Sequence, residues 1–476
     1  MKLYIVSVNL EIFAQLDHPH PSDKIQSIGA LSIASVIART FPKDLVELKC
    51  IEGLDTDSAK AIANMIDEDA THVGFSIYSW STDLLCGVAK ILKKRNPDIV
   101  LFAGGNNITY YTDTYDKMKL FDTLVVGEGE LATVAIIQKW LDEETPEHIV
   151  SVSIPDLTPL DSPWIEPFAD LTSPEVSWEL SRGCIFNCSY CCLSWGLEDR
   201  GVRHFSLERL QKELDIFVHS NVPRIVILDP TFNYDKKRAI SILDQLAEKA
   251  PDIQFVFEVR PEYIDEEFLI HLQKLKNATI RYGIQSIHPQ VLTAVHRAPM
   301  DKAHLEHLHE LFKKYHTDVC VDLILGLPTD TYSGFCESLD YVYTLGSRII
   351  SFTLMLPPVS HMYKDRELWG IQINPNYPNF IQSTSTMSEE DVIKATQISL
   401  ICNALFQDPQ YEDLTEFLHS LDLSFSKFLE LLSAYMRVDA KARVGLIDPE
   451  FKDIMNNAKV LLEYLYMQQL YELSSN

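Results

Sequence analysis

Long apolar segments are missing from this sequence. No run of apolar residues reaches the roughly 18 that a membrane-spanning helix needs. The first residues form a short β-like stretch without the apolar core and small-residue cleavage site of a secretion signal. Internal repeats and low-complexity tracts are missing as well. We therefore expect a cytoplasmic globular protein that works without a membrane.

Basic residues are also scarce. The 476-residue chain has 41 Lys and Arg against 68 Asp and Glu, a formal net charge of −27, and it contains no basic block. A field of this sign opposes the approach of polyanions. This balance argues against a protein whose main partner is RNA or DNA, and it favours a peptide or a small metabolite as substrate.

A disulfide framework is not expected. The nine cysteines are an odd number, clustered at 184–192 and otherwise scattered, a pattern typical of free thiols and a metal site in a reducing compartment. The second C-x2-C pair that many zinc sites carry is missing too. The cysteine cluster itself therefore becomes the most informative feature of the chain.

Three cysteines occur with the spacing C-x3-C-x2-C in Ser181-Arg-Gly-Cys-Ile-Phe-Asn-Cys-Ser-Tyr-Cys191. A [4Fe–4S] cluster has four irons, so three thiolates leave one iron open, as a catalytic metal site leaves a position for a reacting ligand. We predict Cys184, Cys188 and Cys191 as cluster ligands. The alternatives are a zinc knuckle and three unrelated core cysteines.

This cysteine spacing resembles the signature of the radical S-adenosylmethionine (SAM) superfamily. The resemblance implies that SAM binds the open iron through its amino and carboxylate groups, and that an electron from the cluster cleaves it to a 5′-deoxyadenosyl radical. Tyr190 matches the aromatic position that usually lies against the adenine. An electron donor of the flavodoxin or ferredoxin type is implied as a partner.

Residues 1–145 alternate between strand and helix patterns. Expected strands are Leu3–Val8, His72–Ile77, Ile99–Ala103 and Thr123–Val126, with helices over Ile28–Thr40, Asp83–Lys94 and from Leu131. Strand, glycine turn and helix in repetition predict an α/β, doubly wound, Rossmann-like domain with its ligand crevice at the carboxyl ends of the strands.

Three motifs make this segment resemble the cobalamin-binding-type domain that precedes many radical SAM domains: Val73–Tyr78, Ala103–Asn106 and Val126–Glu130. The D-x-H-x-x-G motif that ligates cobalt from below is absent, and Asp17-His-Pro-His-Pro21 has the wrong spacing and is expected to be a loop. Either cobalamin binds without a lower histidine, or the domain is a scaffold. We favour the scaffold, so cobalamin is possible but not favoured as a cofactor.

The rest of the chain divides into three segments. Residues 146–172 are proline-rich and read as a linker. Residues 173–365 contain six strand patterns with helices between them, which predicts a partial (β/α)6 TIM barrel with its chemistry at the carboxyl ends of the strands. Residues 366–476 read as a helical C-terminal region. The expected barrel strands are Val176–Leu180, Arg224–Leu228, Gln254–Val259, Thr279–Ile284, Asp318–Leu325 and Arg348–Met355.

Polar residues follow the barrel strands where a cationic SAM would need them. The resemblance implies that Asp229 accepts the SAM ammonium, that Glu258 and Arg260 bind its ribose hydroxyls and carboxylate, and that Gln285 and Ser286 of the Gly-x-Gln-Ser motif contact it. Each has a structural alternative, such as an Asp-Pro turn for Asp229. Arg297 is interpreted as an ordinary helix charge.

Cys320, Cys336 and Cys402 are candidates for a second chemical role. A thiol can return a hydrogen atom to a substrate radical because the S–H bond is weaker than most C–H bonds. The alternative for each is a small, packed hydrophobic residue, the commonest role of a free cysteine.

The architecture, the missing cobalt ligand and Ile28–Ala34 resemble peptide epimerases of proteusin pathways. This resemblance implies conversion of L residues to D residues in a ribosomally synthesised peptide, with a cysteine thiol as hydrogen donor. The main alternative is a cobalamin-dependent radical SAM C-methyltransferase, and a third is a non-enzymatic scaffold that keeps only the fold.

Overall fold

The computed structural model describes residues 1–9, 26–111, 116–164, 167–194, 201–374, 379–407, 413–436, 457–462 and 464–465. The chain divides into two compact units. The first unit contains Met1–Gly183, Val202–Asp229 and Leu246–Phe255, and the second contains Cys184–Gly201, Pro230–Gln245 and Val256–Asn476.

The N-terminal sheet is parallel and has the strand order β2-β1-β3-β4-β5-β6. Its strands are β1 (Lys2–Asn9), β2 (Glu47–Leu54), β3 (His72–Ser76), β4 (Val100–Gly104), β5 (Thr123–Val125) and β6 (Ile149–Val150). Its helices are α2 (Ile28–Thr40), α3 (Ala59–Asn64), α4 (Thr82–Arg95), α5 (Asn106–Tyr111) and α6 (Glu130–Leu141). The strand order reverses between β1 and β3, which places the ligand crevice of such a sheet at their carboxyl ends.

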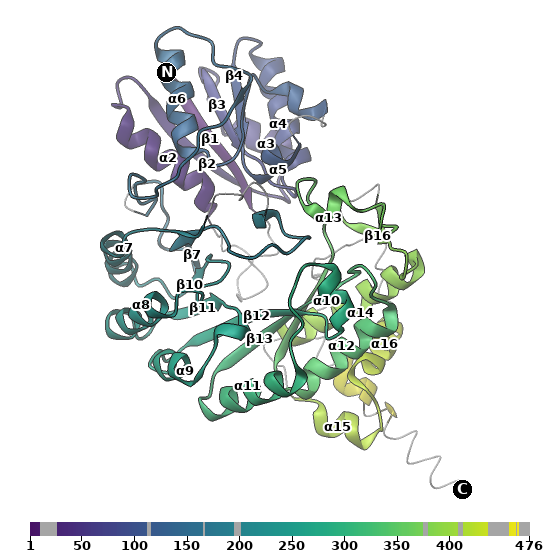
Figure 1. Ribbon diagram of the computed structural model, residues 1–476. Helices are drawn as coiled ribbons and strands as arrows, with labels where there is room; N and C mark the ends of the chain where they lie inside the picture. Colours follow the sequence, from purple (N-terminus) through teal and green to yellow (C-terminus); the bar gives the residue numbers. More distant parts are fainter. Residues whose placement is uncertain are drawn as a thin grey trace, which may run out of the picture. The chain divides into compact units, whose positions relative to one another are not determined.

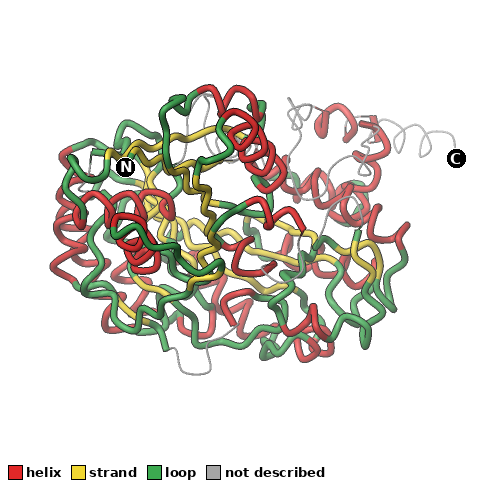
Figure 2. The backbone as a smooth tube through the Cα atoms, turned by 90° about the horizontal axis from the view of Figure 1, so that it is seen from above, coloured by secondary structure: helices red, strands yellow, loops and turns green. Residues whose placement is uncertain are grey.

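Helices bury both faces of this sheet. Successive side chains of β1 point to opposite faces and therefore belong to two different cores. Leu3 and Ile5 belong to one core, with residues of α2 and α6, whereas Tyr4 and Val6 belong to a second core with residues of α3 and α4. Figure 1 shows these helices on either side of the strands, and Figure 2 draws helices in red and strands in yellow as seen from above. The predicted doubly wound domain is confirmed.

The second sheet has the strand order β14-β13-β12-β11-β10-β7. Its strands are β7 (Val176–Trp178), β10 (Arg224–Ile227), β11 (Gln254–Glu258), β12 (Ala278–Gln285), β13 (Asp318–Leu325) and β14 (Arg348–Thr353). Its helices are α7 (Leu207–His219), α8 (Lys236–Lys249), α9 (Glu266–Leu272), α10 (Pro289–Ala294), α11 (Lys302–Lys314) and α12 (Tyr332–Thr344). This succession of strands and helices confirms the predicted barrel-like domain.

Several of these helices begin at residues suited to cap them. The side chains of Ser206, Asp301 and Thr331 accept hydrogen bonds from the first-turn amides of α7, α11 and α12. Caps of this kind satisfy amides that have no partner inside the helix. They fix where each helix starts, and so how the preceding loop leaves its strand.

A short antiparallel ribbon interrupts the barrel between β7 and α7. It consists of β8 (Ser181–Arg182) and β9 (Arg203–His204), which pair Ser181 with His204 and Arg182 with Arg203. The two strands of the ribbon therefore flank the segment 183–202, which carries the clustered cysteines.

The C-terminal helices expected from the sequence are present as α14 (Glu389–Gln407), α15 (Thr415–Ser420) and α16 (Phe425–Met436). Asn403 of α14 accepts a hydrogen bond from the Ser351 amide at 2.8 Å and donates to its carbonyl at 2.9 Å, which fixes the helix to β14. The short elements before them are α13 (His361–Lys364), β15 (Gln372–Ile373) and β16 (Ile381–Ser383).

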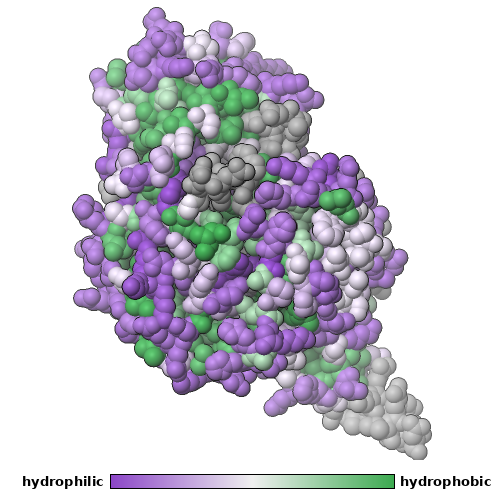
Figure 3. Space-filling model, in the orientation of Figure 1, coloured by the Kyte–Doolittle hydropathy of each residue, from purple (hydrophilic) through white to green (hydrophobic). Residues whose placement is uncertain are grey.

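Two sequence expectations fall outside the described residues: the Asp17–Pro21 loop and part of the helical region expected over 366–476. The bounds of the four predicted segments stay predictions. Within the described residues, no helix combines the length and the apolar character needed to span a bilayer. The face of the molecule in Figure 3 is largely hydrophilic, with hydrophobic residues in separate groups.

Candidate functional site: a three-cysteine pocket

The loop with the clustered cysteines starts at Gly183, whose φ of +98° is a conformation that glycine adopts readily. The Ser189 amide donates to the Val295 carbonyl at 3.1 Å, and the Ser189 carbonyl accepts from the Met362 amide at 2.9 Å. The Cys191 amide donates to the Cys188 carbonyl at 3.0 Å. The loop is thus held to two other segments by the backbone of Ser189, which lies between its second and third cysteines.

Cys184, Cys188 and Cys191 line one pocket, which is partly open to solvent. The pocket is also lined by Phe186, Tyr190, Leu193, Pro230, Thr231, Glu258, Val259, Arg260, Arg281, Tyr282, Gly283, Gln285, Arg297 and Asp322. The structure therefore brings the three predicted ligands together with four of the six predicted cofactor-binding residues.

The arrangement of the thiols fits a cluster. Among the described residues, no three His, Cys, Asp or Glu side chains converge closely enough to share one metal ion. In a [4Fe–4S] cluster each cysteine binds a different iron, so the thiols must surround a volume and need not meet at a point. Three thiols around one pocket meet that requirement.

Arg260 joins the pocket wall to the cysteine loop. Its guanidinium carbon lies 3.7 Å from the ring centroid of Phe186, between the first two cysteines. Asn233 fixes its backbone, since the Asn233 side chain accepts from the Arg260 amide and donates to the Arg260 carbonyl, both at 2.9 Å. The buried Nη1 of Arg260 makes no hydrogen bond within the described chain, and Glu262 lies 4.0 Å away. This donor is available to an anionic ligand group such as a carboxylate.

Gln285 owes its position to Gly283. A Cβ atom on Gly283 would lie 1.8 Å from Nε2 of Gln285, so the amide occupies space that only glycine leaves free. Gln285 has a φ of +70° and follows a register shift between β12 and β13. Its buried Oε1 makes no hydrogen bond in the described part of the chain. Unusual backbone and an unused acceptor at a pocket are typical of a ligand contact.

Three charged side chains from adjacent strands line the pocket floor. Nε of Arg281 donates to Oδ1 and Oδ2 of Asp322 at 3.0 and 3.1 Å. Burial raises the pKa of Asp322, although Arg281 opposes this shift. Glu258 is exposed at the pocket, yet desolvation by the surrounding protein raises its pKa, with Arg281 opposing this shift. The floor therefore offers both a cation and carboxylates to a ligand.

Tyr190 and Arg297 complete the wall nearest the cysteines. Burial raises the pKa of the Tyr190 hydroxyl, which keeps it neutral. Nη2 of Arg297 donates to the Gly283 carbonyl, so this arginine braces the strand end that carries Gln285. Arg297 is therefore part of the pocket wall and differs from the surface helix charge expected from the sequence.

Two predicted cofactor-binding residues lie outside the residues that line the pocket. Asp229 is buried, and its carboxylate accepts from the Leu180 amide at 2.8 Å, the Ser181 amide at 2.9 Å and the Ser181 hydroxyl at 2.5 Å. Ser286 is fully buried, and its hydroxyl accepts from the His288 amide at 3.2 Å. Their roles toward SAM stay predictions.

The three candidate hydrogen donors are likewise not among the pocket-lining residues. Cys320 on β13 and Cys402 on α14 are buried, and Cys336 on α12 is half-buried beside Tyr332 and Glu430. Burial raises the pKa of Cys336 to about 11. The surroundings of these cysteines match the packed-residue alternative, and the donor role stays a prediction.

At the carboxyl end of β3, Tyr78 and Trp80 stack with ring centroids 4.7 Å apart and planes 4° from parallel. The Trp80 indole donates to the Val8 carbonyl at 3.0 Å, yet the residue is 40% exposed. This aromatic pair lies at the ligand edge of the N-terminal sheet. It leaves an apolar surface of the kind on which a flat macrocycle can lie.

Sequence reasoning missed Phe186, Arg281 and Asp322. The first is within the cysteine motif, and the alternation of β12 and β13 could have flagged the other two, because a charged residue inside a buried strand requires a partner or a ligand. Arg281 and Asp322 are partners of each other, and both line the pocket, where a ligand can reach them.

Residues 178–342 match the Radical SAM superfamily, and residues 25–137 match the B12 binding domain. The chain is thus a radical SAM enzyme with an N-terminal B12-binding domain.

Curated relatives point in the same direction. The chain is 25% identical to an uncharacterized methyltransferase of Pyrococcus horikoshii, over 73% of this chain and 79% of that protein. It is 25% identical to the cobalamin-dependent radical SAM methyltransferase TokK of Streptomyces tokunonensis, over 64% of this chain and 47% of TokK. It therefore spans about half the length of TokK.

Solved structures share the fold. TsrM of Kitasatospora setae, a radical SAM methyltransferase solved with tryptophan and a SAM analogue, superposes with a TM-score of 0.62 over 99% of both chains at 13% identity. OxsB, a cobalamin-dependent SAM radical enzyme solved with aqua-cobalamin, gives 0.67 over all of this chain and 81% of OxsB at 14% identity. The curated relatives are named methyltransferases, which favours the methyltransferase alternative over the epimerase, and the match to the B12 binding domain revises our preference for a scaffold domain.

Proposed function

We propose that this protein is a cobalamin-dependent radical SAM methyltransferase. The observation that carries the proposal is the presence, in one chain, of a three-cysteine pocket and a B12-binding domain whose ligand edge carries the stacked pair of Tyr78 and the partly exposed Trp80. When bound, the cluster supplies the electron that cleaves SAM, and the corrinoid supplies the methyl group.

The residues of the pocket have distinct tasks in this proposal. Cys184, Cys188 and Cys191 hold the cluster. The unused Nη1 of Arg260 binds the SAM carboxylate, which is the charge-assisted bond that its burial favours. Gln285 uses its free acceptor to orient the ligand, and the Glu258 carboxylate accepts from ribose hydroxyls.

At the N-terminal domain, Tyr78 and Trp80 provide an apolar surface for the corrin ring. The sequence lacks the D-x-H-x-x-G motif, so the proposal includes binding without a lower histidine ligand from that motif. Spectroscopy of hydroxocobalamin bound to the protein tests this directly, because a histidine ligand shifts the corrin absorbance. We expect the spectrum of a corrinoid without a coordinating imidazole.

The methylated partner is proposed to be a peptide, in keeping with the acidic surface, which disfavours nucleic acid. The test is an anaerobic reaction in D2O with reconstituted protein, hydroxocobalamin, reductant, candidate peptides and SAM carrying a trideuteromethyl group. A peptide that gains the trideuteromethyl group supports methyl transfer. A peptide that gains only one solvent deuterium and yields D residues on hydrolysis would support the epimerase instead.

A further inference from the structure

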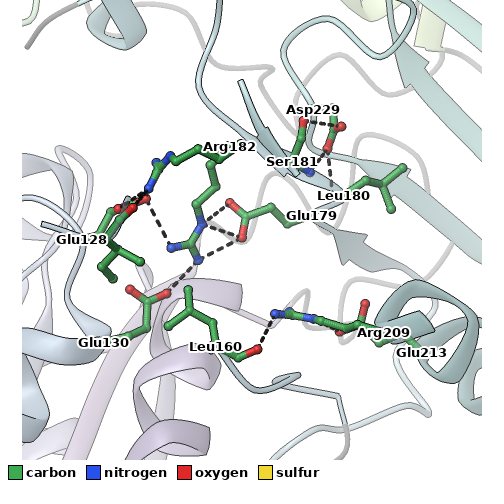
Figure 4. Close-up of polar contacts among 12 residues, drawn as sticks. Glu128, Glu130, Leu160, Glu179, Leu180, Ser181, Arg182, Arg209, Glu213 and Asp229 are labelled. Atoms are coloured by element: carbon green, nitrogen blue, oxygen red, sulfur yellow. Dashed lines mark hydrogen bonds and ion pairs between the residues drawn. The ribbon is translucent and has the colours of Figure 1, made fainter. Parts of the chain in front are cut away.

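The β5–α6 turn carries two carboxylates that are bound by the cysteine-loop ribbon (Figure 4). Glu128 accepts from Nη1 and Nη2 of Arg203 at 2.9 and 2.7 Å, and from Nη1 of Arg182 at 3.4 Å. Glu130 accepts from Nη2 of Arg182 at 2.7 Å. The Val126–Glu130 motif of the N-terminal sheet is therefore tied to both strands of the ribbon.

Arg182 and Arg203 face each other directly across the ribbon. Like charges at such a cross-strand position repel and open the pair unless an anion neutralises them. Glu128 contacts both guanidiniums, whereas Glu130 and Glu179 contact Arg182 alone, so Glu128 is the carboxylate that bridges the pair. Since the ribbon begins and ends the segment 183–202, Glu128 closes the base of the cysteine loop.

The network is shielded from water, so its bonds are strong and the loss of one partner is costly. The side chains of Arg182 and Arg203 are 14% and 16% exposed, and that of Glu128 is 21% exposed. Burial opposes ionisation of Glu128, but the two arginines overcome this and lower its pKa. The carboxylate is thus charged at neutral pH.

A second carboxylate anchors the other side of the ribbon. The three hydrogen bonds that Asp229 accepts from Leu180 and Ser181 fix the first strand of the ribbon to the end of β10. Glu179 completes the cluster around Arg182, with 3.0 Å between its carboxylate and the guanidinium. The ribbon is therefore bound at one side by a barrel strand and at the other by the ligand edge of the N-terminal sheet.

We propose that Glu128 is a positioning residue that holds the base of the cysteine loop to the β5–α6 turn, with Asp229 as the opposing anchor. Its purpose rests on the proposed function, because methyl transfer needs the cluster loop and the corrinoid edge in a fixed relation. The effect of Glu128 on the cysteine loop does not depend on the proposed function. The positioning role and the methyltransferase function can therefore fail separately.

The test uses the full chain with Glu128→Gln, which keeps the shape and removes the charge that bridges Arg182 and Arg203. Hydrogen exchange of the cluster-free protein is measured at the ribbon amides, including the Phe205 amide that donates to Leu180. We expect exchange at least about tenfold faster, since a lost charge-assisted bond is worth about that factor. The reconstituted variant is expected to keep its iron content but to show an altered electron paramagnetic resonance signal when SAM is added to the reduced cluster.

Two further variants sharpen the result. Glu208→Gln removes an exposed carboxylate that pairs only with Lys212 in the described contacts, and it is expected to change neither readout. Glu128→Gln combined with Arg203→Gln removes the unbalanced charge and is expected to restore slow exchange at least partly. Wild-type exchange and a wild-type signal in Glu128→Gln overturn the proposal. Failure of every protein to transfer a methyl group, with these effects intact, contradicts only the proposed function.

Discussion

The guanidinium of Arg260 lies on the ring of Phe186, 3.7 Å from its centroid. Phe186 is one of the three residues between Cys184 and Cys188, so the x positions of the C-x3-C motif do more than space the ligands. They place an aromatic ring under the arginine whose Nη1 is left without a hydrogen bond in the described chain. The cysteine loop thereby helps to hold Arg260, a cationic residue that lines the pocket, in place.

This relationship predicts the effect of Arg260→Lys. An ammonium group keeps the charge but loses the planar stacking and the second donor. SAM affinity is expected to fall about tenfold, the effect of one charge-assisted hydrogen bond, while the iron content stays unchanged. Anaerobic calorimetry of the reconstituted protein measures this. Arg39→Lys, at an exposed ion pair with Asp161, is the matched control, and equal losses in both variants would contradict the role of Arg260.

Gly283→Ala is expected to act through Gln285. The added methyl group would lie 1.8 Å from the flexible end of that side chain, so the fold can adapt but the amide must move. SAM affinity should fall by about three- to tenfold in Gly283→Ala, in Gln285→Ala and in the double variant alike, because all three lose one hydrogen bond. Additive losses would show that Gly283 acts independently of Gln285.

The predictions made from sequence succeed where a periodic pattern reports burial. The helix expected over Ile28–Thr40 and the strand expected over Asp318–Leu325 are found with the same bounds. The edge strand β2 was missed, because Glu47, Lys49 and Glu52 interrupt its apolar pattern and most of it is exposed or half-buried. Strand β6 is too short to show any period.

Single substitutions to alanine at Cys320, Cys336 and Cys402 are expected to leave methyl transfer within about twofold of wild type and to cost about 1 kcal/mol of stability. None of the three lines the pocket, so we expect each to act as a packed side chain. Product analysis and urea denaturation measure the two effects. A variant that still cleaves SAM but loses its product would restore the thiol-donor hypothesis.

Glu179 makes stability depend on pH. Burial raises its pKa from 4.5 to about 7, with Arg182 opposing and Glu130 and Asp229 adding to the shift. The folded state therefore binds more protons than the unfolded state between these values, and stability falls as pH rises from 4.5 to about 7. Glu179→Gln is expected to flatten this fall by at most roughly 3 kcal/mol. Urea midpoints across this range test it, with Glu208→Gln as control, and an unchanged slope would contradict the buried carboxylate.

The candidate site was only partly predictable from the sequence, because some of its contacts leave no local or periodic pattern. Cys184, Cys188, Cys191 and the Gly-x-Gln-Ser motif are local, so their spacing alone reports them. The partners of Asp229 depend on a ribbon of two-residue strands, which has no sequence period. Which buried carboxylate anchors a loop, and which faces a ligand, is decided by contacts between segments far apart in the chain.

The most direct test of the proposed methyltransferase is the fate of SAM when no substrate is present. Reconstituted protein is incubated anaerobically with reductant and SAM, with and without hydroxocobalamin, and the products are quantified. We predict about one S-adenosylhomocysteine per chain that depends on hydroxocobalamin, because methyl transfer to the corrinoid leaves that product. Cleavage to 5′-deoxyadenosine alone, unaffected by hydroxocobalamin, together with failure to retain the corrinoid, would contradict the account.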